Sequence, residues 1–320
     1  MARYFLELAY LGTNFHGWQR QPNGVSVQQV LEEGLSTLLQ QEVAVTGAGR
    51  TDAGVHARYM VAHFDWDRPF MSMQKLVQKL NRFLPRDIVV YSVSEVAPDA
   101  HSRFDAVARR YEYHVSTVKD PFSQQLATRL RFPVDVARMN EAAALLPQCS
   151  DFTSFSKLGG NNKTNLCKVQ EAYWEERGTL LVFHIEADRF LRNMVRALVG
   201  TLLDVGRGKL RVEDFAAIIK ACDRGATGTS APAEGLYLVD VRYPEAVFKR
   251  SVSYKRRPAG KRWAASAVPD APGRFGLQVQ HVQSVFNDGT LLGGFLQKQG
   301  GFGVVNQIVA QMIGTQCLVG

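Results

Sequence analysis

Hydrophobic and polar residues alternate along the first hundred residues in a pattern that predicts strands separated by helices. The alternation has the period of two expected for half-buried strands. Strands are predicted at residues 3–10, 59–66 and 88–96, with a weaker candidate at 42–46. This pattern is typical of a sheet with one covered face.

Two helices are predicted between these strands. Ser26 and Gln29 have the spacing of a capping box. The apolar residues that follow fall on one helical face, namely Val27, Val30, Leu31, Leu35, Leu38 and Leu39. A second helix is predicted at 73–84, with Pro85 just beyond its end. The order strand, helix, strand, strand, helix, strand indicates a split βαβ unit.

The second half of the chain nearly repeats this order. Strands are predicted at 110–117, 166–177, 179–187 and 236–243, and helices at 136–146, 190–205 and 212–222. The two strands around Gly178 have the pattern of a hairpin. We therefore predict an α+β fold of two similar split-βαβ, ferredoxin-like halves, with antiparallel sheets flanking a central basic cleft.

The predicted domain boundaries follow from this order. Residues 1–103 form the N-terminal half, residues 104–248 form the C-terminal half, and residues 249–320 are predicted to be a weakly ordered, irregular extension. This extension holds nine Lys or Arg and two Asp, so it carries +7 of the net charge of +8. The overall charge is therefore no evidence for a nucleic-acid surface on the main body.

Composition excludes several classes of protein. The apolar stretches are shorter than the roughly 20 residues of a membrane-spanning helix, and the first residues alternate like a strand, unlike a signal peptide. The cysteines, Cys149, Cys167, Cys222 and Cys317, are scattered without a Cys-x-x-Cys pair. We expect a cytoplasmic protein without a membrane segment, a metal site or disulfides.

The segment GAGRTDAGVHA, residues 47–57, is the first candidate for chemistry. It lacks the third glycine and following helix of a dinucleotide fingerprint and the Gly-Lys-Ser/Thr of a phosphate-binding loop, so both are excluded. Two interpretations remain open. The glycines favour a structural turn, whereas Arg50 beside Asp52 favours a catalytic loop, because a carboxylate near a guanidinium stays ionised.

Two further segments combine basic and aromatic or apolar residues. In HSRFDAVARRYEYHV, residues 101–115, Tyr111 and Tyr113 share one face of a predicted strand, either as core residues or as a surface for a base beside a phosphate. In FLRNMVRALVGTLLDVGRG, residues 190–208, Arg192 and Arg196 lie four apart on a predicted helix. Arg196 either extends along the core to solvent or is buried and pairs with Asp52.

These segments together closely resemble the bacterial tRNA pseudouridine synthase A family. The resemblance rests, in order along residues 3–244, on NFHGWQRQPN, residues 47–57, residues 101–115, DFTSFS, residues 190–208 and AEGLYLVDVRYP. It implies an isomerase that converts uridine to pseudouridine at positions 38, 39 and 40 in the anticodon stem-loop of tRNA. It also implies a homodimer without metal or organic cofactor.

The resemblance also assigns roles to residues. Asp52 matches the catalytic nucleophile, Arg50 the residue that enters the RNA stack when the base flips out, Tyr111 the residue that packs on the target base, and Arg196 the partner of the carboxylate. Further RNA contacts are expected at His16, Gln19, Arg20, Arg58, Arg110 and Arg192. The chain departs from the family at Leu11, where the family usually has Asp, and in the extension 249–320.

Two alternative functions compete with this one. A non-catalytic RNA-binding protein could use the same cleft, although it has no need for the carboxylate of Asp52. An N-glycoside hydrolase would need a second carboxylate near Asp52 as general acid, and the motif offers none.

Overall fold

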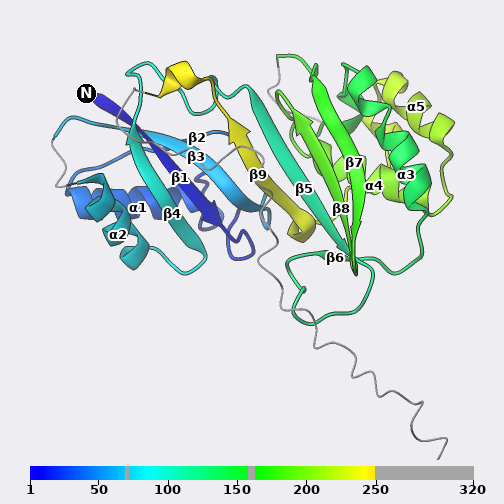
Figure 1. Ribbon diagram of the computed structural model, residues 1–320, viewed down its shortest axis with the longest axis horizontal. Helices are drawn as coiled ribbons and strands as arrows, with labels where there is room; N and C mark the ends of the chain where they lie inside the picture. The colour runs from blue at the N-terminus through cyan, green and yellow to red at the C-terminus, as the bar shows by residue number, and fades with distance from the viewer. Residues whose placement is uncertain (69–71, 158–162, 249–320) are drawn as a thin grey trace, which may run out of the picture. The chain divides into compact units, whose positions relative to one another are not determined.

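The structure is a computed structural model that describes residues 1–68, 72–157 and 163–248. The predicted extension 249–320 lies outside the described residues. Within these ranges the strands join in one nine-stranded sheet, so the two halves share a sheet across the predicted boundary at 103/104. Figure 1 shows this sheet with α1 and α2 beside one end and α3, α4 and α5 beside the other.

The N-terminal half has the strand order of a split βαβ unit. Its elements are β1 (Ala2–Tyr10), α1 (Val27–Leu39), β2 (Thr46–Gly47), β3 (His56–Trp66), α2 (Met73–Phe83) and β4 (Ile88–Glu95). The sheet runs β4-β1-β3, with β2 also paired to β3, and all of these pairs are antiparallel. The predicted pattern is confirmed, although of the candidate strand at 42–46 only Thr46 lies in a strand, as the first residue of β2.

The C-terminal half repeats the same order. Its elements are β5 (Ala108–Ser116), the two-residue β6 (Thr128–Arg129), α3 (Val136–Ala143), β7 (Val169–Arg177), β8 (Leu180–Ala187), α4 (Met194–Gly206), α5 (Val212–Ala221) and β9 (Leu236–Arg242). The sheet continues β9-β5-β8-β7 in antiparallel pairs. The α+β class with two split-βαβ halves is therefore confirmed.

The halves meet at a short parallel pair in the centre of the sheet. His56 and Ala57 at the start of β3 pair with Tyr237 and Leu238 of β9. This pairing explains why β3 begins three residues before the predicted strand at 59–66, since its partner lies about 180 residues away in sequence. The last described strand thus holds the two halves together.

Each half has a hydrophobic core between the sheet and its helices. The first packs Leu31 and Leu35 of α1 and Leu80 of α2 against β1, β3 and β4. The second packs α3, α4 and α5 against β5, β7 and β8, with Phe183 and Leu198 fully buried. Burial of large apolar side chains contributes about 1.5–3 kcal/mol each, so each half has its own source of stability.

Local capping sets the ends of several helices. Ser26 accepts a hydrogen bond from the backbone N–H of Gln29, as the predicted N-cap requires, whereas the Gln29 side chain donates to Glu33 instead of turning back. α3 ends at Ala143, three residues short of the predicted end, because Pro147 cannot continue an α-helix. Gly178 takes the left-handed conformation (φ +61°) at the predicted hairpin.

Candidate functional site

The loop between β2 and β3, residues 48–55, carries Arg50 and Asp52 and is held by the loop that follows β1. The Tyr10 hydroxyl lies 2.9 Å from Thr51 Oγ1, and the backbone N–H of Trp18 donates to the Thr51 carbonyl at 3.2 Å. The backbone N–H of Gly54 donates to the Phe15 carbonyl at 3.3 Å. The two residues that flank Asp52, Thr51 and Ala53, are thus part of a loop fixed on both sides.

Glycines let the two loops approach each other. Gly17 has φ +82°, and a Cβ there would lie 2.4 Å from the Thr51 carbonyl oxygen. A Cβ on Gly12 would lie 1.9 Å from the Val55 carbonyl oxygen. Both distances are below any real van der Waals contact, so the catalytic-loop candidate depends on glycine in the neighbouring loop as well as in its own sequence.

His56 secures the end of this loop. It is 1% exposed, its Nδ1 accepts from the backbone N–H of Gly12 at 3.0 Å, and its Nε2 lies 2.9 Å from the Gln125 carbonyl and 3.1 Å from the Glu234 carbonyl. Burial lowers the pKa of His56. The neutral ring, with its proton on Nε2, therefore joins the loop after β1, the loop after β5 and the turn before β9.

The Asp52 carboxylate faces two guanidinium groups from the other half of the chain. Arg196 Nη1 lies 3.4 Å from Oδ2, and Arg192 Nε lies 3.8 Å from Oδ1. The Asp52 side chain is 29% exposed, Arg196 is 22% exposed and Arg192 is 61% exposed. The predicted pairing of Arg196 with Asp52 is present, and the carboxylate remains open to a ligand.

Arg196 reaches Asp52 because of the way α4 begins. Arg196 Nε donates to the Ala231 carbonyl at 2.7 Å, which orients the guanidinium plane toward the loop. The predicted helix start at 190 is wrong, because Asn193 has a left-handed backbone (φ +66°) and α4 begins at Met194. Arg192 therefore precedes the helix, yet its side chain still points toward Asp52.

Tyr111 lies on β5 beside the same carboxylate. It is partly exposed, and its ring packs edge-on against Phe190 with centroids 5.0 Å apart at 82°. Burial raises the pKa of Tyr111 to about 12. The positive charge of Arg109 lowers this pKa and the negative charge of Asp52 raises it, but both effects are smaller than that of burial. The hydroxyl is therefore neutral at physiological pH and can donate a hydrogen bond.

The remaining N-terminal candidates lie at the surface. Arg50 is exposed, and no hydrogen bond or ion pair of its side chain is seen among the described residues. His16, Gln19 and Arg20 are also exposed, on the loop that supports Thr51, and Arg20 pairs with Glu32 at 3.4 Å. The exposed guanidinium of Arg50 lies two residues from Asp52 in the same fixed loop.

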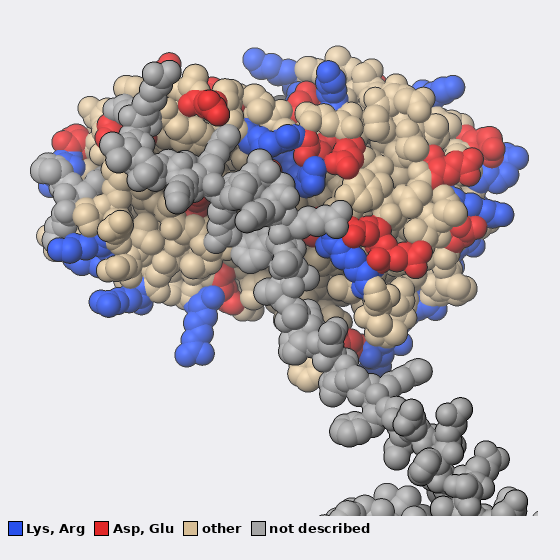
Figure 2. All heavy atoms as spheres, in the orientation of Figure 1, with Lys and Arg blue, Asp and Glu red and all other residues tan. Residues whose placement is uncertain are grey.

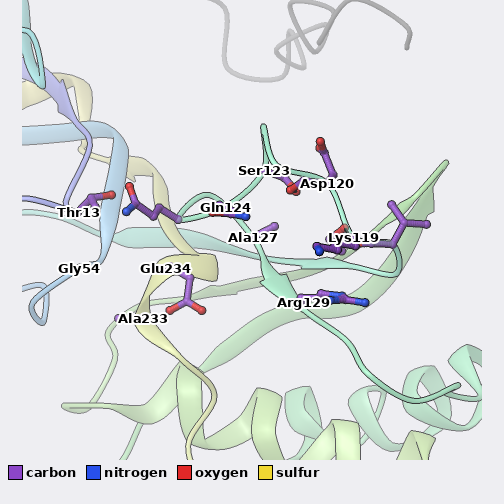
Figure 3. Close-up of a pocket in the computed structure, with 13 residues that line it drawn as sticks. Thr13, Gly54, Lys119, Asp120, Ser123, Gln124, Ala127, Arg129, Ala233 and Glu234 are labelled. Carbon is purple, nitrogen blue, oxygen red and sulfur yellow. Dashed lines mark hydrogen bonds between the residues drawn. The ribbon is translucent and has the colours of Figure 1, made fainter. Parts of the chain in front are cut away.

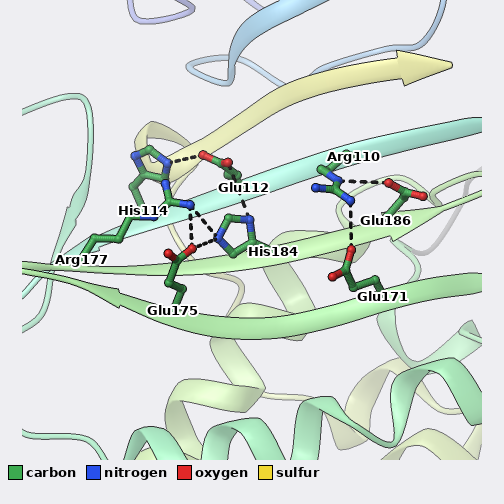
Figure 4. Close-up of polar contacts among 8 residues, drawn as sticks. All are labelled: Arg110, Glu112, His114, Glu171, Glu175, Arg177, His184 and Glu186. Atoms are coloured by element: carbon green, nitrogen blue, oxygen red, sulfur yellow. Dashed lines mark hydrogen bonds and ion pairs between the residues drawn. The ribbon is translucent and has the colours of Figure 1, made fainter. Parts of the chain in front are cut away.

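Arg58 and Arg110 lie on the other face of the sheet from Tyr111. Because side chains alternate along β5, Arg110 and Glu112 point away from the face that carries Tyr111 and Tyr113. Arg110 pairs with Glu171 and Glu186, and Glu112 contacts His114 and His184, as Figure 4 shows. Arg58 stacks over Tyr237, whose ring also packs on His114. The structure does not bring these two arginines to Asp52.

Charges on this molecule do not form a single large patch in the view of Figure 2, where basic and acidic side chains lie side by side. A pocket of about 520 Å³ lies next to the loop that carries Asp52 but is not lined by Asp52 itself. Figure 3 shows it between Gly54, Glu234 and the segment that follows β5, with Lys119 and Arg129 among its residues.

Neither a metal centre nor a membrane span is seen in the part of the chain that the structure describes. There, no group of three or more His, Cys, Asp or Glu side chains is placed to hold a metal ion. Over the same residues, no helix has the length and apolar character needed to cross a membrane.

Comparison with known proteins agrees with the geometry. A family profile described as tRNA pseudouridine synthase matches residues 8–105 and 143–244, so it covers both halves that meet at Asp52. The chain belongs to this family. It is 56% identical over 248 residues to tRNA pseudouridine synthase A of Bacteroides fragilis, which covers 77% of this chain and 98% of that protein.

Other members of the tRNA pseudouridine synthase family are also similar. The chain is 55% identical over 248 residues to tRNA pseudouridine synthase A of Parabacteroides distasonis, covering 78% of this chain and 98% of that protein. It is 38% identical over 245 residues to the protein of the same name from Exiguobacterium sibiricum, covering 77% and 98%. The family resemblance predicted from the motifs is confirmed.

Two residues around the site were not among the predicted site residues of this pseudouridine synthase. Phe190, the first residue of the predicted helix 190–205, instead precedes α4 and packs on Tyr111. Arg109 lies two residues before Tyr111 on the same face of β5 and donates hydrogen bonds to four backbone carbonyls. Residues two apart on a strand point to the same face, so the prediction of Tyr111 as a site residue could also have indicated Arg109.

Proposed function

We propose that this protein converts uridine to pseudouridine at positions 38, 39 and 40 in the anticodon stem-loop of tRNA. The observation that carries the proposal is the meeting of Asp52, Tyr111 and Arg196 from three separate elements at one partly open carboxylate. Membership of the tRNA pseudouridine synthase family supplies the reaction class. The position in tRNA rests on the resemblance of the motifs to the synthase A family.

The reaction keeps all atoms of the nucleotide. The bond between N1 of uracil and C1′ of ribose breaks, the base turns, and a bond between C5 and C1′ forms while the proton on C5 is lost and N1 gains one. Asp52 can act by attacking C1′, by adding to the base, or by removing a proton from the sugar. Each route needs a carboxylate at the flipped nucleotide, which the structure supports at Asp52.

The neighbours of Asp52 have separate roles in this proposal. Arg196 orients the carboxylate, because its guanidinium is itself fixed by the Ala231 carbonyl. Tyr111 packs on the target base with a neutral hydroxyl, and Arg50 fills the space that the flipped nucleotide leaves in the RNA stack. Flipping costs a few kcal/mol, which such stacking contacts can offset. Exclusion of water from the site prevents hydrolysis at C1′, which would otherwise release the uracil base from the RNA.

The alternatives are less well supported. Within the described residues, the charged groups paired with the Asp52 carboxylate are the guanidinium groups of Arg192 and Arg196. An N-glycoside hydrolase would need a second carboxylate as general acid, and the motif around Asp52 offers none. A pure RNA-binding protein would gain nothing from a carboxylate beside the RNA phosphates. We further propose that the enzyme is a cytoplasmic homodimer that uses no metal or organic cofactor, as the family resemblance implies.

The test compares wild type, Asp52→Ala and the isosteric Asp52→Asn on unmodified tRNA. Pseudouridine is mapped base by base by carbodiimide labelling and primer extension, and RNA affinity is measured in parallel. We expect product at positions 38, 39 and 40 with wild type. Both variants should bind RNA with near wild-type affinity and lose at least about a thousandfold in rate, because the reacting group is gone.

Two results would contradict the proposal in different ways. Equal product from wild type and Asp52→Asn would remove Asp52 from the chemistry. RNA binding without product from any of the three proteins would favour the non-catalytic RNA-binding alternative. Sedimentation of the wild-type protein tests the homodimer separately.

A further inference from the structure

A turn just before β5 presents an aromatic and a basic side chain to solvent. Phe104 is 73% exposed, and the Arg103 guanidinium carbon lies 5.8 Å from the centre of its ring. A single exposed aromatic residue is common on protein surfaces. Phe104 differs in that a cation lies beside its ring and hydrogen bonds fix the backbone beneath it.

The turn is built around His101. Its Nδ1 accepts from the backbone N–H groups of Arg103 at 3.1 Å and Phe104 at 3.3 Å, and its ring packs against Phe104 with centroids 4.2 Å apart. Asp105 accepts from the backbone N–H of His101 at 2.7 Å. Burial and the nearby Arg3 lower the pKa of His101, which keeps Nδ1 available as an acceptor.

Two side chains tie this turn to the strand that leads into the catalytic loop. Ser102 Oγ donates to the Thr46 carbonyl at 2.8 Å. Arg109 Nη2 donates to the carbonyls of Arg103 at 2.6 Å and Ala48 at 3.1 Å. Ala48 is two residues from Arg50, so the turn and the catalytic loop share their anchors.

Arg109 also joins the turn to the Tyr111 side of the sheet. Its Nη1 donates to the carbonyls of Ala106 at 2.9 Å and Asp188 at 2.8 Å, and Asp188 lies two residues before Phe190. Arg109 and Tyr111 share one face of β5, so the Arg103 carbonyl that Arg109 binds lies near the side of the strand that carries Tyr111. The turn with Arg103 and Phe104 is therefore held next to elements that carry Tyr111 and Asp52.

From this arrangement we propose that Phe104 and Arg103 form a second contact for the substrate RNA, outside the Asp52 site. Phe104 stacks on a nucleobase that flanks the target uridine, and Arg103 contacts its phosphate. An aromatic ring next to a cation is the usual chemistry for binding an unpaired nucleotide. The fixed turn lowers the entropy lost on binding. The inference rests on the proposed function, because it takes tRNA as the ligand.

The experiment uses the full chain and an anticodon stem-loop RNA with 2-aminopurine next to the target uridine. Stacking on Phe104 quenches this base, so fluorescence reports the contact directly. We expect Phe104→Ala to lose the quench and to weaken RNA binding about tenfold, as loss of one stacked base does. The rate at saturating RNA should stay within about twofold of wild type, and Phe104→Trp should retain the quench.

Phe122→Ala is the matched control. Phe122 is 85% exposed in the segment beyond the other end of β5, and we expect its removal to leave quench and affinity unchanged. Thermal unfolding of each variant shows that the fold is retained, which is expected because both rings are largely in solvent.

Each other outcome is decisive. A Phe104→Ala variant that binds and quenches like wild type overturns the proposal, as does an equal loss in Phe122→Ala. A change in sedimentation without a change in RNA binding would assign the ring to contact with a second copy of the chain. If wild type forms no pseudouridine but binds RNA through Phe104, the proposed function fails and this contact stands.

Discussion

At the scale of single residues, the site depends on how one carboxylate is oriented. Asp52 has two cationic neighbours among the described residues, and Arg196 is held there by a second side-chain contact, to the Ala231 carbonyl. Arg192 is farther from Asp52 and largely exposed. An exposed ion pair contributes little, whereas a guanidinium fixed at two points sets direction as well as charge.

This difference predicts unequal effects of two conservative substitutions. Arg196→Lys keeps the charge but cannot bond both Ala231 and Asp52, so we expect the rate at saturating tRNA to fall about tenfold to a hundredfold with little change in KM. Arg192→Lys should change the rate less than about threefold. Single-turnover kinetics on unmodified tRNA measures both, and a larger effect at Arg192 would contradict the assignment.

The sequence could indicate these residues but not their arrangement. Arg50 and Asp52 left both a structural turn and a catalytic loop open, because residue types close in sequence do not show which side chains meet in the fold. The pairing of Asp52 with Arg196 was one of two alternatives, and 144 residues separate the partners. Phe190 on Tyr111 was missed because it was assigned to a helix that begins only at Met194.

At the scale of elements, the loop that carries Asp52 is shaped by a neighbouring loop as much as by its own glycines. The loop after β1 supplies the contacts to Thr51 and Gly54. Local patterns predicted the helices and most strands because capping and alternation are set by nearby residues. They missed the start of β3, whose partner β9 is distant, and the left-handed Asn193.

Gly17 tests the contact between the two loops. In Gly17→Ala the new Cβ would lie 2.4 Å from the Thr51 carbonyl, and the backbone would keep φ +82°. We expect a loss of about 1–3 kcal/mol in the free energy of unfolding and a lower rate, since Thr51 adjoins Asp52. Denaturant unfolding and single-turnover kinetics measure the two effects.

Gly49→Ala is the control in the same region. A Cβ at Gly49 meets no atom within 4 Å, so stability should stay within about 0.5 kcal/mol of wild type. Equal losses in both variants would show that the loop responds to any added side chain and that the Gly17 contact is not specific.

At the scale of the whole molecule, charge is distributed unevenly along the chain. Residues 249–320 carry +7 of the net +8, and the family match ends at residue 244. The central basic cleft stays a prediction; the basic side chains beside Asp52 among the described residues are Arg192 and Arg196. The boundary at 103/104 stays a prediction, although the repeat of strand order on its two sides supports it.

Removal of residues 249–320 tests the contribution of this charge. We expect tRNA affinity at low salt to fall a few-fold and the slope of log Kd against log salt to become shallower, because fewer counterions are released. The rate at saturating tRNA should not change. Loss of folded protein on truncation would contradict the prediction and would make these residues part of the structural core.

The central position of β9 has a consequence for how the protein is made. Residues 236–242 fill the gap between β3 and β5, so the strand that unites the halves is the last of the described strands to leave the ribosome. Most of each core can form earlier, but His56 of β3 can pair with Tyr237 only after residues 236–242 have been synthesised. Nascent chains that stop short of β9 therefore lack the strand pairing that joins the two halves, and we expect pseudouridine synthesis only after nearly the whole fold has been translated.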